Sequence, residues 1–151
     1  MNVVVIGLSH HTSPLELRER FAFGESKIPA ALAQLRDSGI ALESVILSTC
    51  NRVEIYAVTT LPPAKAFSGL TDFLVGASGT ASERAPDSIY RLTDPESLRH
   101  LFKVACGLDS MVLGETEIFG QLKEAYALAH GHRHTGPRLN IAFQRAFHVA
   151  K

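Results

Sequence analysis

The stretch VILSTCNRVEIYAV, residues 45–58, contains two apolar runs separated by a short polar segment. Residues 45–47 are all apolar, which is typical of a short buried strand. Residues 53–58 alternate between two kinds of side chain with a period of two, which is typical of a second strand. Because only a few residues join the two runs, the sequence predicts a strand pair with a tight turn at a sheet edge.

The predicted turn carries a thiol, Cys50, with Arg52 two residues further on. A thiol reacts as its thiolate, and an unperturbed Cys is only slightly ionised near neutral pH. The permanent cation of Arg52 could favour the thiolate, so Cys50 is a candidate nucleophile. The residues alone leave a second interpretation open, in which Cys50 is a small buried hydrophobe.

Length and composition limit the class of protein. The chain has 151 residues, a hydrophobic fraction of 46% and a formal net charge of zero, which suits one compact domain without an overall basic field. Its two Cys residues share no motif, so we expect a reducing, cytoplasmic location and no disulfide framework. We expect neither a signal peptide nor a membrane span, since no apolar run approaches roughly 20 residues.

The expected elements follow the order β-α-β-β-α-β. Asn2–Leu8 is a β-branched run typical of a central strand, the two strands around Cys50 come next, and Ser88–Leu92 is a short fourth strand. Helical periodicity separates them at residues 14–22, at residues 26–38, and after Pro62-Pro63. This order predicts an α+β fold built on a ferredoxin-like plait. The small polar residues Gly76–Pro86 predict a loop.

Three further helices are expected after the plait. Asp94 is placed to cap the first, with Pro95 at its first position. The second covers Phe119–Gly131, and the third begins near Pro137. No stop signal follows the third helix, so we expect it to be truncated at residue 151.

Three separated segments of the chain are distinctive: GLSHHTSP at 7–14, LSTCNRVE at 47–54 and GLDSMVLGE at 107–115. They resemble segments of glutamyl-tRNA reductase. They occur in that family's order and at its approximate separations, and the third continues through TEIFGQ, residues 116–121, into an expected helix. The family usually has Gln at the position of Glu117 and a small residue, often Ser, at that of Cys106.

The resemblance implies an enzyme that reduces glutamyl-tRNA to glutamate-1-semialdehyde. This is the first step of tetrapyrrole (haem, porphyrin) biosynthesis by the five-carbon pathway. The resemblance further implies that Cys50 attacks the ester and forms a thioester. It implies NADPH as cofactor, bound by a domain absent from this chain, and the chain indeed has no G-x-G-x-x-G or G-x-x-x-x-G-K-[ST] motif. No metal is expected.

The same resemblance divides the chain. Residues 1–136 would form the catalytic, glutamate-recognition domain, and residues 137–151 would start a long linker helix towards the missing NADPH-binding domain. We expect the isolated chain to show at most a partial thioester-forming or esterase activity. We also expect a glutamyl-tRNA substrate, haem as a feedback effector, a homodimer for the full-length protein and a monomer for the fragment.

The resemblance also implies a substrate pocket. Arg52 offers two parallel donors to the substrate carboxylate, although it could instead pair with Glu54. Glu115 is the natural partner of the substrate ammonium, although an acid there could simply stabilise a helix N-terminus. His100 lies off the apolar stripe of its helix and is expected as an acid or base near Cys50. The other implied pocket residues are Thr49, Asn51, Ser110, Thr116, Glu117 and Gln121, of which Thr49 and Asn51 could instead stabilise the turn.

A different class of function stays open at this point. The chain could be a non-enzymatic module that binds tRNA or senses haem through His and Cys ligands. The expected fold supports many functions and therefore does not decide between an enzyme and a binding module.

Overall fold

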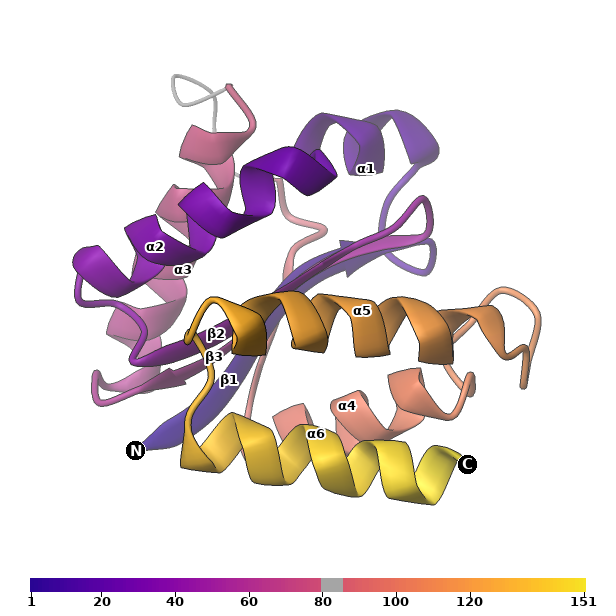
Figure 1. The fold of residues 1–151 in the computed structure, drawn as a ribbon. Coiled ribbons are helices and arrows are strands. Elements are labelled where there is room, and N and C mark those ends of the chain that lie inside the picture. Colours follow the sequence, from indigo (N-terminus) through magenta and orange to yellow (C-terminus); the bar gives the residue numbers. More distant parts are fainter. Residues whose placement is uncertain (80–85) are drawn as a thin grey trace.

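The computed structural model describes residues 1–79 and 86–151. A four-stranded sheet lies between two groups of helices, as Figure 1 shows. The elements are, in chain order, β1 (Asn2–Ser9), α1 (Leu15–Phe21), η1 (Glu25–Lys27), α2 (Ile28–Asp37), β2 (Glu43–Ser48), β3 (Arg52–Thr59), α3 (Pro63–Ala77), β4 (Tyr90–Thr93), α4 (Glu96–Ala105), α5 (Glu117–Gly131) and α6 (Pro137–Ala150).

The strands lie in the order β2-β3-β1-β4, and each neighbouring pair is antiparallel. Ser48 of β2 lies opposite Val53 of β3, and Ser9 at the end of β1 lies opposite Arg52. The ends of three strands therefore meet at the Cys50 turn. The predicted mixed α and β fold is confirmed, and the elements follow the predicted order along the chain.

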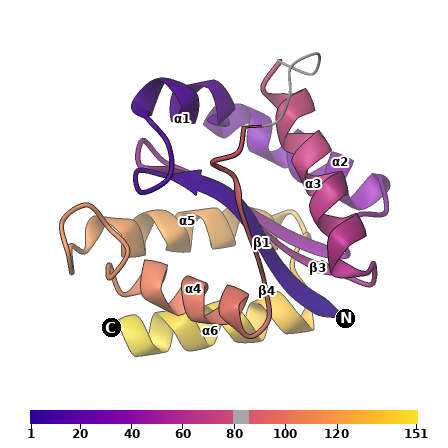
Figure 2. The same ribbon diagram turned by 180° about the vertical axis from the view of Figure 1, so that it is seen from behind.

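Helices cover both faces of the sheet. α1, α2 and α3 lie on one side and α4, α5 and α6 on the other, as the two opposite views show (Figures 1 and 2). Every residue of β3 is buried as a result. On the face towards α6, the ring of Tyr56 meets that of Phe143 edge to face, with centroids 5.4 Å apart. Polar side chains on that face are consequently removed from water as well.

Two expected helix starts differ from the structure. Asp94 does not cap α4: its carboxylate accepts the backbone N–H of Val3 at 2.8 Å, and Pro95 occupies the N-cap position without a side-chain cap. The prediction was wrong because a carboxylate that can accept hydrogen bonds from the first turn of a helix can equally accept one from a neighbouring strand.

α5 begins at Glu117, two residues before the expected start. Of the expected loop from Gly76 to Pro86, residues 80–85 lie outside the described residues.

A cap supplied from another element fixes the start of α6. The buried carboxylate of Glu43, on β2, accepts the backbone N–H groups of Gly136, Leu139 and Arg138, at 2.6, 2.9 and 3.3 Å. A carboxylate at this end of a helix satisfies otherwise unpaired donors and interacts favourably with the helix dipole. α6 is thereby attached directly to the sheet.

Candidate active site

The turn between β2 and β3 presents Cys50 to solvent. The backbone N–H of Thr49 donates to the carbonyl oxygen of Arg52 at 2.8 Å and closes the turn. The Thr49 hydroxyl oxygen accepts the N–H groups of Asn51 and Arg52, at 3.1 and 3.2 Å. Thr49 thus stabilises the turn, as one of the two predicted interpretations had it, and Cys50 at its tip is exposed.

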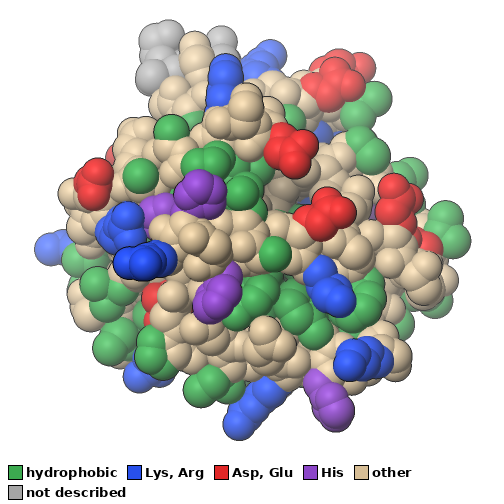
Figure 3. All heavy atoms as spheres, viewed as in Figure 1, with side chains coloured by type: hydrophobic (Ala, Val, Ile, Leu, Met, Phe, Trp, Pro, Cys, Tyr) green, Lys and Arg blue, Asp and Glu red, His purple; other side chains and the backbone are tan. Residues whose placement is uncertain are grey.

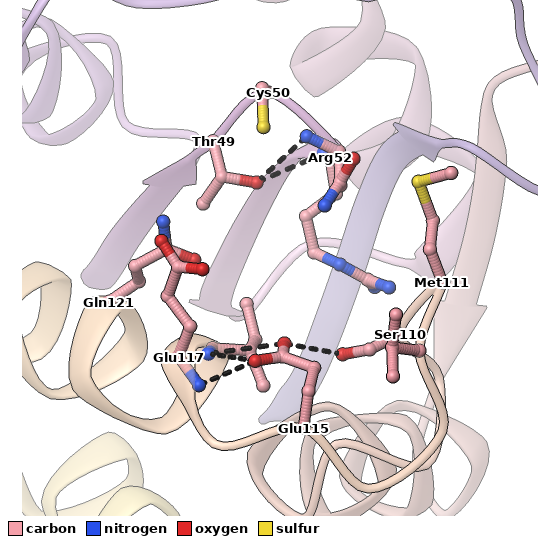
Figure 4. Close-up of a pocket in the computed structure, with 11 residues that line it drawn as sticks. Thr49, Cys50, Arg52, Ser110, Met111, Glu115, Glu117 and Gln121 are labelled. Carbon is pink, nitrogen blue, oxygen red and sulfur yellow. Dashed lines mark hydrogen bonds between the residues drawn. The ribbon is translucent and has the colours of Figure 1, made fainter.

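A pocket of about 360 Å³ opens beside this turn. Figure 4 shows Thr49 and Cys50 on one side, facing Ser110, Glu115 and Glu117 across the cavity. The opposite wall comes from the loop between α4 and α5 and from the first turns of α5, so segments far apart in the chain form the site. The lining residues are Thr49, Cys50, Asn51, Arg52, Ser110, Met111, Val112, Glu115, Glu117, Ile118 and Gln121.

Arg52 belongs to a buried polar network at the edge of this pocket. Its side chain is 1% exposed and that of Glu54 is 0% exposed. Arg52 Nη1 donates to Glu54 at 3.3 Å, and Nη2 donates to the backbone oxygen and the carboxylate of Asp109, at 2.8 and 2.9 Å. Tyr56 and Tyr90 donate to the two oxygens of Glu54, at 2.7 and 2.5 Å. Two carboxylates of the protein therefore already bind the guanidinium.

Electrostatics keep this network ionised at its centre. Burial alone would raise the pKa of Glu54, but a hydrogen bond with His100, the charge of His100 and the charge of Arg52 lower it from 4.5 to about 2. Burial would also lower the pKa of Arg52, and the charge of Glu54 raises it above its ordinary value instead. Burial, followed by Glu54, raises the pKa of Tyr56 and Tyr90, so both remain donors.

The start of α5 forms the acidic side of the pocket. The carboxylate of Glu115 accepts the hydroxyl of Ser110 at 3.0 Å and the backbone N–H groups of Glu117 and Ile118. It therefore stabilises the helix N-terminus, as the alternative interpretation had it. The carboxylate still lines the pocket, where it could also contact a ligand cation.

Comparison with known proteins places this site in a family. The family model described as "Glutamyl-tRNAGlu reductase, N-terminal domain" matches residues 6–151. The chain belongs to the glutamyl-tRNA reductase family. It corresponds to the N-terminal domain of that family, as the description of the matching model states, and it covers only about a third of the length of the relatives with this name.

Three relatives with this name illustrate the similarity. The chain is 46% identical to the glutamyl-tRNA reductase of Stenotrophomonas maltophilia (strain K279a), over 100% of its own length and 33% of that protein. It is 42% identical to that of Paenibacillus macerans, again over 100% of its length and 34% of the relative. The solved structure of glutamyl-tRNA reductase from Methanopyrus kandleri matches 98% of the chain and 33% of its own, with 31% identity and a TM-score of 0.81.

The structure brings together most of the residues that the resemblance to glutamyl-tRNA reductase implied. Two of them do not line the pocket. His100, on α4, contacts the carboxylate of Glu54 through its Nε2. Thr116 is exposed at the N-cap position of α5. The residues that do line it are Thr49, Cys50, Asn51, Arg52, Ser110, Glu115, Glu117 and Gln121.

The pairing of Arg52 with Glu54, one of the two predicted interpretations, is confirmed, but sequence reasoning missed the rest of the network beneath the pocket. Arg52, Glu54 and Tyr56 are spaced two apart on one strand, so they share one face of the sheet. That period was visible in the sequence, but nothing in it indicated that α4 and α6 cover this face. The role of Asp109 had no local signal, since it comes from a loop 57 residues away in the chain.

The described residues contain neither a metal-binding cluster nor a helix that could span a membrane. Among residues 1–79 and 86–151, no group of three or more His, Cys, Asp or Glu residues could bind a metal ion. Figure 3 shows Lys, Arg and His side chains spread over the face of α5 and α6, with uncharged surface between most of them. None of the helices that the structure describes has the length and apolar character needed to cross a membrane.

Proposed function

We propose that this chain is the acyl-transfer domain of an NADPH-dependent glutamyl-tRNA reductase, which forms glutamate-1-semialdehyde for tetrapyrrole synthesis. The observation that carries the proposal is an exposed Cys50 at the wall of a pocket that contains several polar side chains, in a chain that matches this family over residues 6–151. The matched relatives are about three times as long as the chain, so this proposal extends to a larger protein. We also assign the sheet and its helices to the ferredoxin-like plait, on the order of the strands.

The pocket suits a glutamyl group. Its carboxylates, Glu115 and Glu117, offer acceptors to the substrate ammonium, and Ser110 and Gln121 offer neutral polar contacts. Glu117 stands where the family usually has Gln, which adds negative charge to this wall. Arg52 lines the pocket, and its role in binding the side-chain carboxylate of the substrate stays a prediction, since Glu54 and Asp109 already bind its guanidinium.

The chemistry of the chain is then transfer of an acyl group from oxygen to sulfur. The Cys50 thiolate attacks the ester carbon, the carbon–sulfur bond forms, and the bond to the ribose oxygen breaks. The ribose oxygen leaves as the tRNA hydroxyl after it takes up a proton. The acid or base role of His100 stays a prediction, since its ring contacts Glu54 and does not line the pocket.

The cofactor does not fit this chain. The sequence contains neither a G-x-G-x-x-G motif nor a P-loop, so no segment shows the glycine-rich phosphate site of a dinucleotide. We place NADPH, which would supply the reducing hydride, on a part of the protein outside this chain. The cytoplasmic location, the dimer of the full-length protein, the haem effector and the division at residue 136 stay predictions.

The direct test is mass spectrometry of the chain after incubation with glutamyl-tRNA. We expect a glutamyl adduct on Cys50, no adduct in Cys50→Ser, and an unchanged adduct in the matched variant Cys106→Ser. An adduct on Cys106, or a Cys50→Ser chain that is still labelled, would contradict the assignment of the nucleophile. No observation in the structure favours the alternative of a non-enzymatic tRNA-binding or haem-sensing module.

A further inference from the structure

Arg18 is a buried cation close to the Cys50 turn. It lies on α1 and is 9% exposed. Its Nη1 donates to the backbone oxygen of Asn51 over 3.4 Å, and its Nε is buried with no hydrogen-bond partner among the described residues. No carboxylate of the described residues forms an ion pair with it.

An unpaired guanidinium is costly inside a protein. The group is permanently charged and carries five N–H donors, and burial removes the water that would otherwise bind them. Buried charges are therefore normally paired. Arg52 follows this rule, since Glu54 and Asp109 both bind it. Arg18 departs from it, and an anion brought by a ligand would supply the missing partner.

Arg18 lines a second hollow beside the candidate nucleophile. This hollow has a volume of about 230 Å³, and its wall includes Thr49 and Cys50. Both of these residues also line the pocket of about 360 Å³ described above. A group attached to the Cys50 sulfur can therefore extend into either space.

The reacting carbon of an aminoacyl-tRNA carries two different arms. One is the amino acid, and the acceptors and donors of the larger pocket suit it. The other is the ribose of the terminal nucleotide, whose nearest anion is its own 5′-phosphate. We propose that Arg18 binds this 5′-phosphate in the hollow beside Cys50. The inference rests on the proposed function and adds a subsite for the tRNA end to it.

One carboxylate borders the same hollow. Glu19 is exposed, so it can remain hydrated and turn towards solvent, whereas the buried Arg18 cannot. Its negative charge opposes a phosphate. Removing it by Glu19→Gln should therefore strengthen phosphate binding, a change opposite in sign to that expected for Arg18.

The test uses stable amide analogues, which bind without an acyl-transfer step. The probes are 3′-glutamylamino-3′-deoxyadenosine 5′-phosphate, the same compound without its phosphate, and the phosphorylated glutaminyl counterpart. NMR titration gives their dissociation constants and shows in the same spectra whether each variant is folded. In the unmodified chain the phosphate should strengthen binding at least about tenfold.

Arg18→Gln should bind the phosphorylated analogue no more tightly than the unphosphorylated one, and its affinity for the unphosphorylated analogue should be unchanged. Arg18→Lys keeps a positive charge at this position, in case the fold requires one. It should lose most of the extra affinity that the phosphate gives, because lysine lacks the planar fork of arginine. Arg20→Gln, an exposed change on the same helix, should retain it.

Two results would overturn the phosphate subsite. The first is an undiminished phosphate gain in both Arg18 variants. The second is an Arg18→Gln chain that no longer distinguishes the glutamyl from the glutaminyl analogue, which would assign Arg18 to the amino-acid carboxylate. If no analogue binds the unmodified chain, the proposed function fails together with the subsite.

Discussion

At the scale of single residues, Glu54 connects most of the polar groups beneath the pocket. Its carboxylate binds Arg52, Tyr56, Tyr90 and His100, and no part of it is exposed. Such a charge is stable in a protein interior only while its partners are in place. The position of the Arg52 guanidinium at the pocket wall therefore depends on Glu54, which does not line the pocket itself.

We predict that Glu54 makes stability fall in acid. Its pKa is about 2 in the folded chain and near 4.5 ordinarily, so the unfolded chain binds the proton more readily. Its contribution of roughly 3 kcal/mol is complete above pH 4.5 and is lost as the pH falls towards 2. Urea unfolding of the unmodified chain should show about half of this loss between pH 5 and pH 3. Glu54→Gln should be less stable at pH 5 and change less between the two pH values. Equal slopes in both proteins would contradict the prediction.

We also predict that iodoacetamide alkylates Cys50 before Cys106 near neutral pH. Cys50 is exposed at the tip of a turn, whereas Cys106 is half-buried at the end of α4. Peptide mapping over time measures the two rates, and the urea-unfolded chain, where both thiols are accessible, provides the control. Faster labelling of Cys106 in the folded chain would count against Cys50 as the accessible nucleophile.

At the scale of elements, the sequence predicted what depends on local pattern. The apolar run at residues 45–47 and the alternation after Arg52 specify two strands, and the few residues between them specify a turn. Side chains that serve another element could not be predicted in this way. Glu43 caps α6, and Asp94 binds β1, because the fold brings distant segments together. For the same reason the unpaired Arg18 on α1 had no signal in the sequence.

The loop between α4 and α5 depends on one glycine. Gly107 has a φ of +74°, and a Cβ there would lie 2.4 Å from the backbone oxygen of Glu115. Gly114 in the same loop also has a positive φ, +79°, but a Cβ there would have no neighbour within 4 Å. A substitution at Gly114 therefore measures the cost of a side chain at positive φ alone, whereas one at Gly107 adds the cost of the steric contact with Glu115.

We predict that Gly107→Ala costs about 2 kcal/mol or more of the free energy of unfolding, while Gly114→Ala costs about 1 kcal/mol. The larger loss should be accompanied by weaker substrate use, since the displaced loop carries Ser110 and Glu115. Urea unfolding of both variants measures the difference. Equal losses would show that the approach to Glu115 is not tight in solution.

At the scale of the whole molecule, one core supports both walls of the pocket. β2 and β3 supply the Cys50 turn, and α5, which supplies the acidic wall, packs against β2 on the α4–α6 side of the sheet. The proposed nucleophile, Cys50, and the groups that would bind the amino acid are thus positioned by residues of this chain. The chain covers only about a third of its relatives, and its sequence has no dinucleotide motif.

We therefore predict that this chain reacts with glutamyl-tRNA but does not reduce it. The thiolate can displace the tRNA hydroxyl, and without hydride the thioester should react slowly with water and release free glutamate. The assay is incubation with radiolabelled glutamyl-tRNA and NADPH, followed by chromatography of the products. Glutamate should appear faster than from glutamyl-tRNA alone, and glutamate-1-semialdehyde should be absent.

The control variant for this assay is Cys50→Ser, because capture by the thiol and the later hydrolysis both require the sulfur. It should release glutamate no faster than the uncatalysed ester does, whereas Cys106→Ser should behave like the unmodified chain. Formation of glutamate-1-semialdehyde by this chain would show that the reductant binds within residues 1–151. Release of glutamate that persists in Cys50→Ser would show hydrolysis without a thioester, and the acyl-transfer assignment would then be wrong.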